Sequence, residues 1–282
     1  MFRREIRTIV CPSCGRLTRE DAAQCLVCGR RRPGLWGLTV LFRRLFGAGS
    51  VTRVISVVCI ALYVASLVFD PMGALRPRGL FDLFAPSQRV LDALGMTGAV
   101  AWAQGRWWTL LTAIYLHGSL LHIAFNVLWI RQLGPAVEEL YGPARFLIIF
   151  TVSGVTGFLV SDLIGLLSPV LVVPFTIGAS GAIFGLLGAM VAFGRRRGGV
   201  FGTLVLRQYG QWALILFIFG LFMSEVVNNW AHAGGFLGGF GAGLMLSLAE
   251  RRSEGSLDHL LAAAMAVLTV AAFGLALWRA LL

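Results

Sequence analysis

Seven long apolar stretches dominate this chain of 282 residues and limit what it can fold into. A helix that crosses a bilayer needs about 17–25 residues, and backbone polar groups inside lipid are satisfied only in helices or in closed barrels. The sequence therefore predicts an all-α polytopic membrane protein with seven transmembrane helices, of which the fourth and fifth are short. These helices are expected near residues 52–69, 115–133, 146–166, 178–194, 209–223, 229–249 and 259–281.

The composition agrees with a membrane protein. Hydrophobic residues make up 57% of the chain, the mean hydropathy is +0.81 and only 13% of residues are charged, whereas a soluble domain carries about 25%. Every basic residue is an arginine, and the absence of lysine excludes a Ser–Lys catalytic pair or a lysine Schiff base. The formal net charge of +11 is compatible with nucleic-acid binding. The arginines, however, gather at the ends of the apolar stretches and in the N-terminal tail, so we expect no nucleic-acid partner.

Arginines in the short loops predict the orientation of the helices, because cytoplasmic loops are rich in Lys and Arg. The loops after the third and fifth helices contain no arginine. We therefore expect an integral protein of a prokaryotic plasma membrane, with its N-terminus in the cytoplasm and its C-terminus outside. No cleavable signal peptide is visible, so the first apolar stretch is expected to stay as an anchor. The arginines used are those before the first helix and those expected after the second, fourth and sixth: Arg43, Arg44, Arg53, Arg131, Arg145, Arg195, Arg196, Arg197, Arg207, Arg251 and Arg252.

The polar segment 1–35 contains four cysteines in two C-x-x-C pairs: Cys11, Cys14, Cys25 and Cys28. Two such pairs, each followed by glycine, can hold one tetrahedral zinc ion. Disulfides or redox-active pairs are an alternative, although the expected cytoplasmic location argues against them; a further alternative is that the thiols do neither. A segment of about 35 residues needs a structural metal ion or disulfides to fold, because its hydrophobic core is too small. We expect a zinc-ribbon-like cytoplasmic head with a structural zinc ion and a possible cytosolic partner, followed by an amphipathic linker at 36–50.

Two clusters of polar residues fall inside the apolar stretches, where such groups are costly and usually functional. The first contains His117, His122 and Asn126; the last two are four residues apart and share one face of a helix. The second contains His232, which precedes a face of small residues that permits very close helix contact. This face is formed by Gly235, Gly239 and Gly243.

Ser180 opens the fourth apolar stretch between two glycines, where a serine can be a packing residue, a helix cap or a nucleophile. Because the second, fourth and sixth helices are expected to run in the same direction, Ser180 would lie at the same depth as His122, Asn126 and His232. Together these side chains offer a nucleophile, a base and oxyanion donors. Metal binding by His117, His122 and His232 is the alternative, but no carboxylate at membrane depth completes such a site.

These motifs resemble the rhomboid family of intramembrane serine proteases over residues 51–250. They are Gly178-Ala179-Ser180-Gly181, His117-x-x-x-x-His122-x-x-x-Asn126 and Ala231-His232-x-x-Gly235-x-x-x-Gly239. The resemblance implies a six-helix protease core, to which residues 251–282 add a cytoplasmic loop and a seventh transmembrane helix. It also implies cleavage of single-span membrane proteins near the extracytoplasmic face of the lipid bilayer, without a catalytic cofactor.

Carried over residue by residue, the resemblance gives Ser180 as the nucleophile and His232 as the general base of a Ser–His dyad. The oxyanion site would be His122, Asn126 and the backbone amide of Ser180. Supporting roles go to Phe184, which would pack against the base, and to Gly178, Gly181, Gly235 and Gly239. Thr109 stands where the family typically has an arginine in its first loop, which leaves the anchoring of that loop open.

Two other functions compete with proteolysis. The chain could be a catalytically silent rhomboid-like protein that binds transmembrane clients, although inactive relatives typically lack the serine or the histidine that this chain has. A transporter or channel would need charged groups along a pathway, and the first six apolar stretches carry almost none.

Overall fold

The computed structural model describes residues 8–10, 16–19, 22–29, 50–75, 79, 81–168, 175–224, 226–246, 248 and 254–281. The chain divides into two compact units, Met1–Ser50 and Val51–Leu282. In the first unit, strands β1 (Thr8–Val10) and β2 (Leu17–Arg19) pair antiparallel. Of the four expected zinc ligands, Cys25 is buried and Cys28 is exposed, whereas Cys11 and Cys14 lie outside the described residues, as does most of the expected linker.

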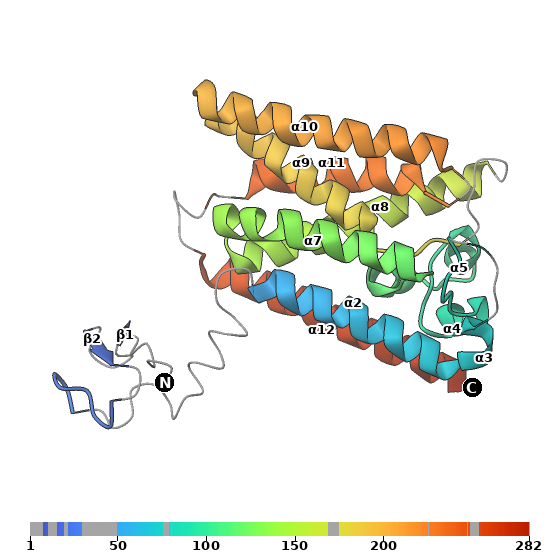
Figure 1. Cartoon of the computed structure of the whole chain (residues 1–282), viewed down its shortest axis with the longest axis horizontal. Coiled ribbons are helices and arrows are strands. Elements are labelled where there is room, and N and C mark those ends of the chain that lie inside the picture. The colour runs from blue at the N-terminus through green and yellow to red at the C-terminus, as the bar shows by residue number, and fades with distance from the viewer. Residues whose placement is uncertain are drawn as a thin grey trace. The chain divides into compact units, whose positions relative to one another are not determined.

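The second unit is a bundle of helices that run alongside one another (Figure 1). Helix α11 packs against α9 and α8, while α10 packs against α9 and α12 against α8. Helix α9 lies at the centre, since every residue from Gly181 to Met190 is buried. Within the described residues the long helices are α2 (Ser50–Phe69), α7 (Leu120–Tyr141), α8 (Pro143–Leu167), α9 (Ser180–Arg197), α10 (Gly199–Phe222), α11 (Asn229–Met245) and α12 (Ser256–Leu281).

The bundle is that of an integral membrane protein. Of the helices in the described part, four are long and apolar enough to cross a membrane by length and composition: α2, α8, α10 and α12. A fifth candidate is the segment Thr109–Tyr115 together with α7, a pair bent by 91°. The central helices α9 and α11 pass no such test, because α9 ends in three arginines and α11 is short. Helix α9 is surrounded by other helices, and α11 packs one face on α9 and α8.

Helix α10 begins ten residues before the expected start at 209, which corrects the sequence prediction. Gly198 and Gly199 have φ values of +65° and +62° and form the turn from α9, a backbone conformation that favours glycine. As a result, Arg195, Arg196 and Arg197 belong to the last turn of α9, and Arg207 lies inside α10. The exposed Arg207 interrupts the apolar run without ending the helix.

The second apolar stretch also differs from its expected bounds of 115–133. A 3-10 helix, Ala113–Tyr115, precedes it, and α7 begins only at Leu120. The side chain of Ser119 caps this helix by accepting a hydrogen bond from the backbone N–H of His122 at 3.3 Å. At its other end, α7 continues through Pro135 to Tyr141.

The connection between α2 and α7 contains short helices that the sequence analysis did not predict: α3 (Pro71–Ala74), α4 (Gln88–Ala93), α5 (Ala99–Ala103) and α6 (Thr109–Thr112). The buried Thr109 anchors this connection. Its hydroxyl lies 2.6 Å from the backbone oxygen of Arg106 and 3.0 Å from the hydroxyl of Thr97, which in turn donates to Asp162 at 2.8 Å. At the position where the family typically has an arginine, a buried threonine thus fixes the loop.

Buried charged groups join the helices at the end of the bundle far from Ser180. Glu138 accepts hydrogen bonds from the backbone N–H of Thr52 at 3.1 Å and from its hydroxyl at 2.9 Å, which ties α7 to the start of α2. Arg145 forms an ion pair of 2.8 Å with Asp258, and both side chains are almost fully buried. This pair holds the start of α12 against the start of α8.

Candidate active site

Helix α9 begins at Ser180, directly after a tight backbone turn. Gly178 has a φ of +119°, and a Cβ atom at this position would collide with the imidazole of His122. Glycine is therefore required here both for the backbone angle and for space. The first N–H groups of α9 have no acceptor within the helix, and they mark the positive end of its dipole.

The hydroxyl of Ser180 faces the imidazole of His232. The distance between Ser180 Oγ and His232 Nε2 is 2.9 Å. His232 is only 7% exposed and lies in the first turn of α11, where Asn228 caps the helix by accepting from the N–H groups of Trp230 and Ala231, both at 3.1 Å. The start of α11 and the start of α9 thus meet at one hydrogen-bonded pair.

Asn229 orients the His232 ring, a contact that the sequence analysis missed. The distance between His232 Nδ1 and Asn229 Oδ1 is 3.2 Å. Because an amide oxygen only accepts, Nδ1 carries the proton and the lone pair of Nε2 is directed at Ser180. The available signal was the spacing: an amide three residues before a histidine shares its helix face.

Phe184 fixes the orientation of the plane of the same imidazole ring. Its ring stacks on His232 with 4.2 Å between centroids and 15° between planes. Phe184 lies one turn after Ser180 on α9, so the helix that carries the hydroxyl also carries the surface against which the imidazole rests.

His122 and Asn126 reach the same place from α7. Nδ1 of His122 accepts from the backbone N–H of Gly118 at 3.3 Å, so the proton of the neutral ring is on Nε2, which lies toward Gly178. Asn126 donates one amide hydrogen to the backbone oxygen of His122 at 2.8 Å. His122 and Asn126 therefore offer N–H donors at the wall of the cavity that Ser180 and His232 also line.

One cavity of about 240 Å³ joins these groups. Its walls include Ser180, His232, His122 and Asn126, together with apolar side chains from α7, α9 and α10. His117 is buried beside His122, with 5.1 Å between ring centroids, but it does not line the cavity. In the part of the chain that the structure describes, no three His, Cys, Asp or Glu side chains converge into a group that could hold a metal ion.

The glycine face of α11 lies directly on α9. A Cβ atom at Gly235 would collide with the backbone oxygen of Gly181, and one at Gly239 would collide with that of Gly185. Such backbone contact is possible only between small residues. It sets the separation of the two helices and hence the distance between the hydroxyl and the imidazole at their ends.

The sequence of the chain is similar to those of known proteins. A family model described as the Rhomboid domain matches residues 104–249. The chain is 39% identical over 173 residues to Rhomboid protease GluP of Bacillus subtilis (58% of this chain, 31% of the relative). It is 32% identical over 184 residues to RHOMBOID-like protein 5 of Arabidopsis thaliana (64% and 58%), and 31% identical over 160 residues to Rhomboid-like protease 3 of Toxoplasma gondii (55% and 58%).

The match spans about a third of GluP and somewhat more than half of the other two relatives. The segment matched by the family model, residues 104–249, includes every residue named above around the cavity and does not include α2 or α12. More than half of the chain matches the family model, and the protein belongs to the rhomboid family.

Proposed function

We propose that the protein is an intramembrane serine endopeptidase that uses Ser180 as nucleophile and His232 as general base. The observation that carries this proposal is the distance of 2.9 Å between Ser180 Oγ and His232 Nε2 inside a cavity of the helix bundle. A hydroxyl within hydrogen-bond reach of a base that a third group orients is the arrangement of an activated nucleophile. Asn229 is the group that orients this base.

In the first step Ser180 Oγ attacks the carbonyl carbon of the scissile peptide and its proton passes to His232 Nε2. The negative charge that develops on the carbonyl oxygen is stabilised by the Nε2–H of His122, the amide of Asn126 and the backbone N–H of Ser180. Collapse of the intermediate breaks the C–N bond, and the leaving amine takes the proton from His232. A water molecule then gives a proton to His232 and attacks the acyl carbonyl carbon. The ester bond to Ser180 breaks, and His232 returns the proton to Ser180 Oγ.

We propose single-span membrane proteins as substrates, because Ser180 lies in a cavity inside the helix bundle of an integral membrane protein. We propose seven membrane crossings, with α7, α9 and α11 completing the number, the N-terminus in the cytoplasm and the C-terminus outside. In this orientation Ser180 lies near the extracytoplasmic face, where water reaches the polar side of the cavity. A prokaryotic plasma membrane fits the distribution of arginines.

Purified full-length protein incubated with a panel of single-span substrates tests this function. Cleavage is expected with the wild type and not with Ser180→Ala or His232→Ala. The double variant should be hardly slower than either single variant. The two residues act as a unit, so removing one already abolishes the contribution of the other. Additive losses would contradict a shared mechanism. Tight binding of the panel without any cleavage by the wild type would favour the catalytically silent alternative.

We further propose that Cys11, Cys14, Cys25 and Cys28 hold one structural zinc ion in the head. The second pair supports this: the N–H of Gly29 bonds to the oxygen of Cys25 at 2.9 Å, and Gly29 has a φ of +70°, which closes the turn around the pair. Elemental analysis should find about one zinc per chain, lost when all four cysteines become serine. If the protein, purified under reducing conditions, contained no zinc, this assignment would be contradicted.

The head is proposed to recruit a cytosolic partner or substrate tails and not to take part in catalysis. Deletion of residues 1–35 should leave cleavage in detergent unchanged and alter activity in cells. Loss of detergent activity by a deletion variant with an unchanged unfolding temperature would overturn this division of roles.

A further inference from the structure

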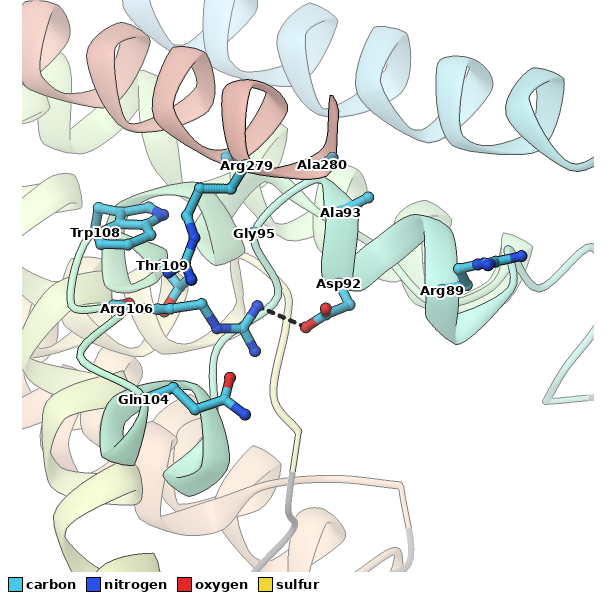
Figure 2. A pocket seen from close by; sticks show the side chains of 11 residues that line it. Arg89, Asp92, Ala93, Gly95, Gln104, Arg106, Trp108, Thr109, Arg279 and Ala280 are labelled. Carbon is cyan, nitrogen blue, oxygen red and sulfur yellow. Dashed lines mark hydrogen bonds and ion pairs between the residues drawn. The ribbon is translucent and has the colours of Figure 1, made fainter. Parts of the chain in front are cut away.

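A second cavity, of about 370 Å³, lies between the α2–α7 connection and the last turn of α12 (Figure 2). It shares no lining residue with the cavity around Ser180. Its volume is about twelve times the roughly 30 Å³ that a water molecule occupies in the liquid, so it has room for a small solute. Nothing in the proposed proteolytic mechanism uses it.

The walls of this cavity carry an excess of positive charge. Arg89, Arg106 and Arg279 line it, and Asp92 is the lining carboxylate. Asp92 accepts from Arg106 Nη1 at 2.8 Å, with 46% of the Asp92 side chain exposed and 13% of that of Arg106. The dashed line in Figure 2 marks this contact, and Arg279 reaches down from α12 toward the same space. Of the three arginines, Arg106 and Arg279 point into the cavity, and Asp92 pairs with Arg106.

Arg106 has a buried donor that the described residues leave without a partner. Its Nε atom is buried and makes no hydrogen bond to them. Buried polar groups are nearly always hydrogen-bonded, and a charged donor is the costliest to leave unmatched. A solute in the cavity that carries oxygen acceptors would complete the hydrogen bonding of the Arg106 guanidinium.

Arg279 is held in place by an aromatic ring. Its guanidinium carbon lies 5.4 Å from the centroid of the Trp108 ring, a distance at which the charge is attracted to the ring face. Trp108 directly precedes Thr109, which stands where the family typically has an arginine. Helix α12, which lies outside the matched segment, thus supplies a cation beside this position.

We propose that this cavity binds a phosphate-type oxyanion, between Arg106 and Arg279. Planar guanidinium groups present paired N–H donors that match the oxygens of a phosphate. The source is either inorganic phosphate or the headgroup of an anionic phospholipid. Such an anion would hold α12 against the α2–α7 connection. In that connection the hydroxyl of Thr109 bonds to that of Thr97. Thr97 in turn exchanges backbone hydrogen bonds of 2.8 and 3.3 Å with Thr176, which lies just before Ser180 in the chain.

The test measures the unfolding temperature of the full chain in two kinds of nanodisc at constant ionic strength. One kind contains phosphatidylcholine alone and is titrated with inorganic phosphate; the other contains equal parts of phosphatidylcholine and phosphatidylglycerol. The variants are Arg106→Gln and Arg279→Gln. The matched control is Arg207→Gln, an exposed arginine of α10 far from the cavity. The exposed position of Arg279 makes its variant the safer one to fold.

For the wild type and the control, the unfolding temperature should rise with phosphate or in the phosphatidylglycerol discs. Each cavity variant should need at least about tenfold more phosphate for the same rise, as expected for the loss of a charged hydrogen bond. A rise with phosphatidylglycerol alone identifies the source as a lipid headgroup, and a rise with phosphate identifies the free anion. No rise with either probe, or an Arg279→Gln variant that responds like the wild type, would overturn the proposal.

Discussion

Nδ1 of His232 lies 3.2 Å from Oδ1 of Asn229, its neighbour three residues earlier on α11. This contact holds the proton on Nδ1 and keeps Nε2 free to accept from Ser180. Asn229→Ala should lower kcat about three- to tenfold, as expected for the loss of about 0.5–1.5 kcal/mol from one neutral hydrogen bond. KM and the unfolding temperature should change little.

Asn229→Asp is the matched control, because a carboxylate also accepts from Nδ1–H. It should retain more activity than the alanine variant in the same cleavage assay. If both variants cleaved at the wild-type rate, Asn229 would have no part in positioning the imidazole.

His122 and Asn126 are expected to act on the transition state. His122→Ala and Asn126→Ala should each lower kcat by roughly 10²–10³-fold with little change in KM, the usual cost of removing one oxyanion donor. Steady-state kinetics on one cleaved substrate measures both constants. A double variant with full kcat would show that the oxyanion lies elsewhere.

The contact between Gly235 and Gly181 predicts that Gly235→Val separates α11 from α9 and moves His232 away from Ser180. A displacement of about 1 Å can cost on the order of 10²-fold in rate. Gly241→Val is the control, because a Cβ atom at Gly241 meets no other atom within 4 Å. Thermal unfolding and cleavage should both fall for Gly235→Val and stay near the wild type for Gly241→Val. Equal behaviour of the two variants would contradict the packing account.

Asp258→Asn tests the buried ion pair that holds α12. Because Arg145 is fully buried and would lose a charged partner at 2.8 Å, the variant should be destabilised by about 3–5 kcal/mol. Glu139→Gln, an exposed residue of α7, should change stability by less than about 0.5 kcal/mol. Thermal unfolding in detergent compares the two, and a wild-type unfolding temperature for Asp258→Asn would show that α12 docks without this pair.

The sequence was sufficient to predict that Ser180 and His232 would meet. Glycines every four residues identify the contact face of α11, and the alternating directions of the helices place their starts at one end. Helix α10 was misplaced at its start because Arg207 breaks the apolar run, although a charged side chain on an exposed face does not end a helix. The family membership, expected from three motifs, is confirmed by the match to residues 104–249.

Other features depend on contacts between distant parts of the chain. Arg279 meets Trp108 only because α12 packs against α4 and α6, and no local pattern in either segment predicts that pairing. The short helices α3 to α6 are too brief for periodicity to reveal them. Thr109 was read as a departure from the family pattern, and its partner Thr97 became apparent only once the connection was folded.

Labelling by a fluorophosphonate probe tests the central claim most directly, since such a probe reacts with a serine that a neighbouring base activates. Purified wild-type protein in detergent is incubated with the probe and the modified residue is located by peptide mass spectrometry. The account predicts a single modification at Ser180, absent in Ser180→Ala and strongly slowed in His232→Ala at an unchanged unfolding temperature. Labelling of His232→Ala at the wild-type rate, or no labelling of a folded wild type, would contradict it.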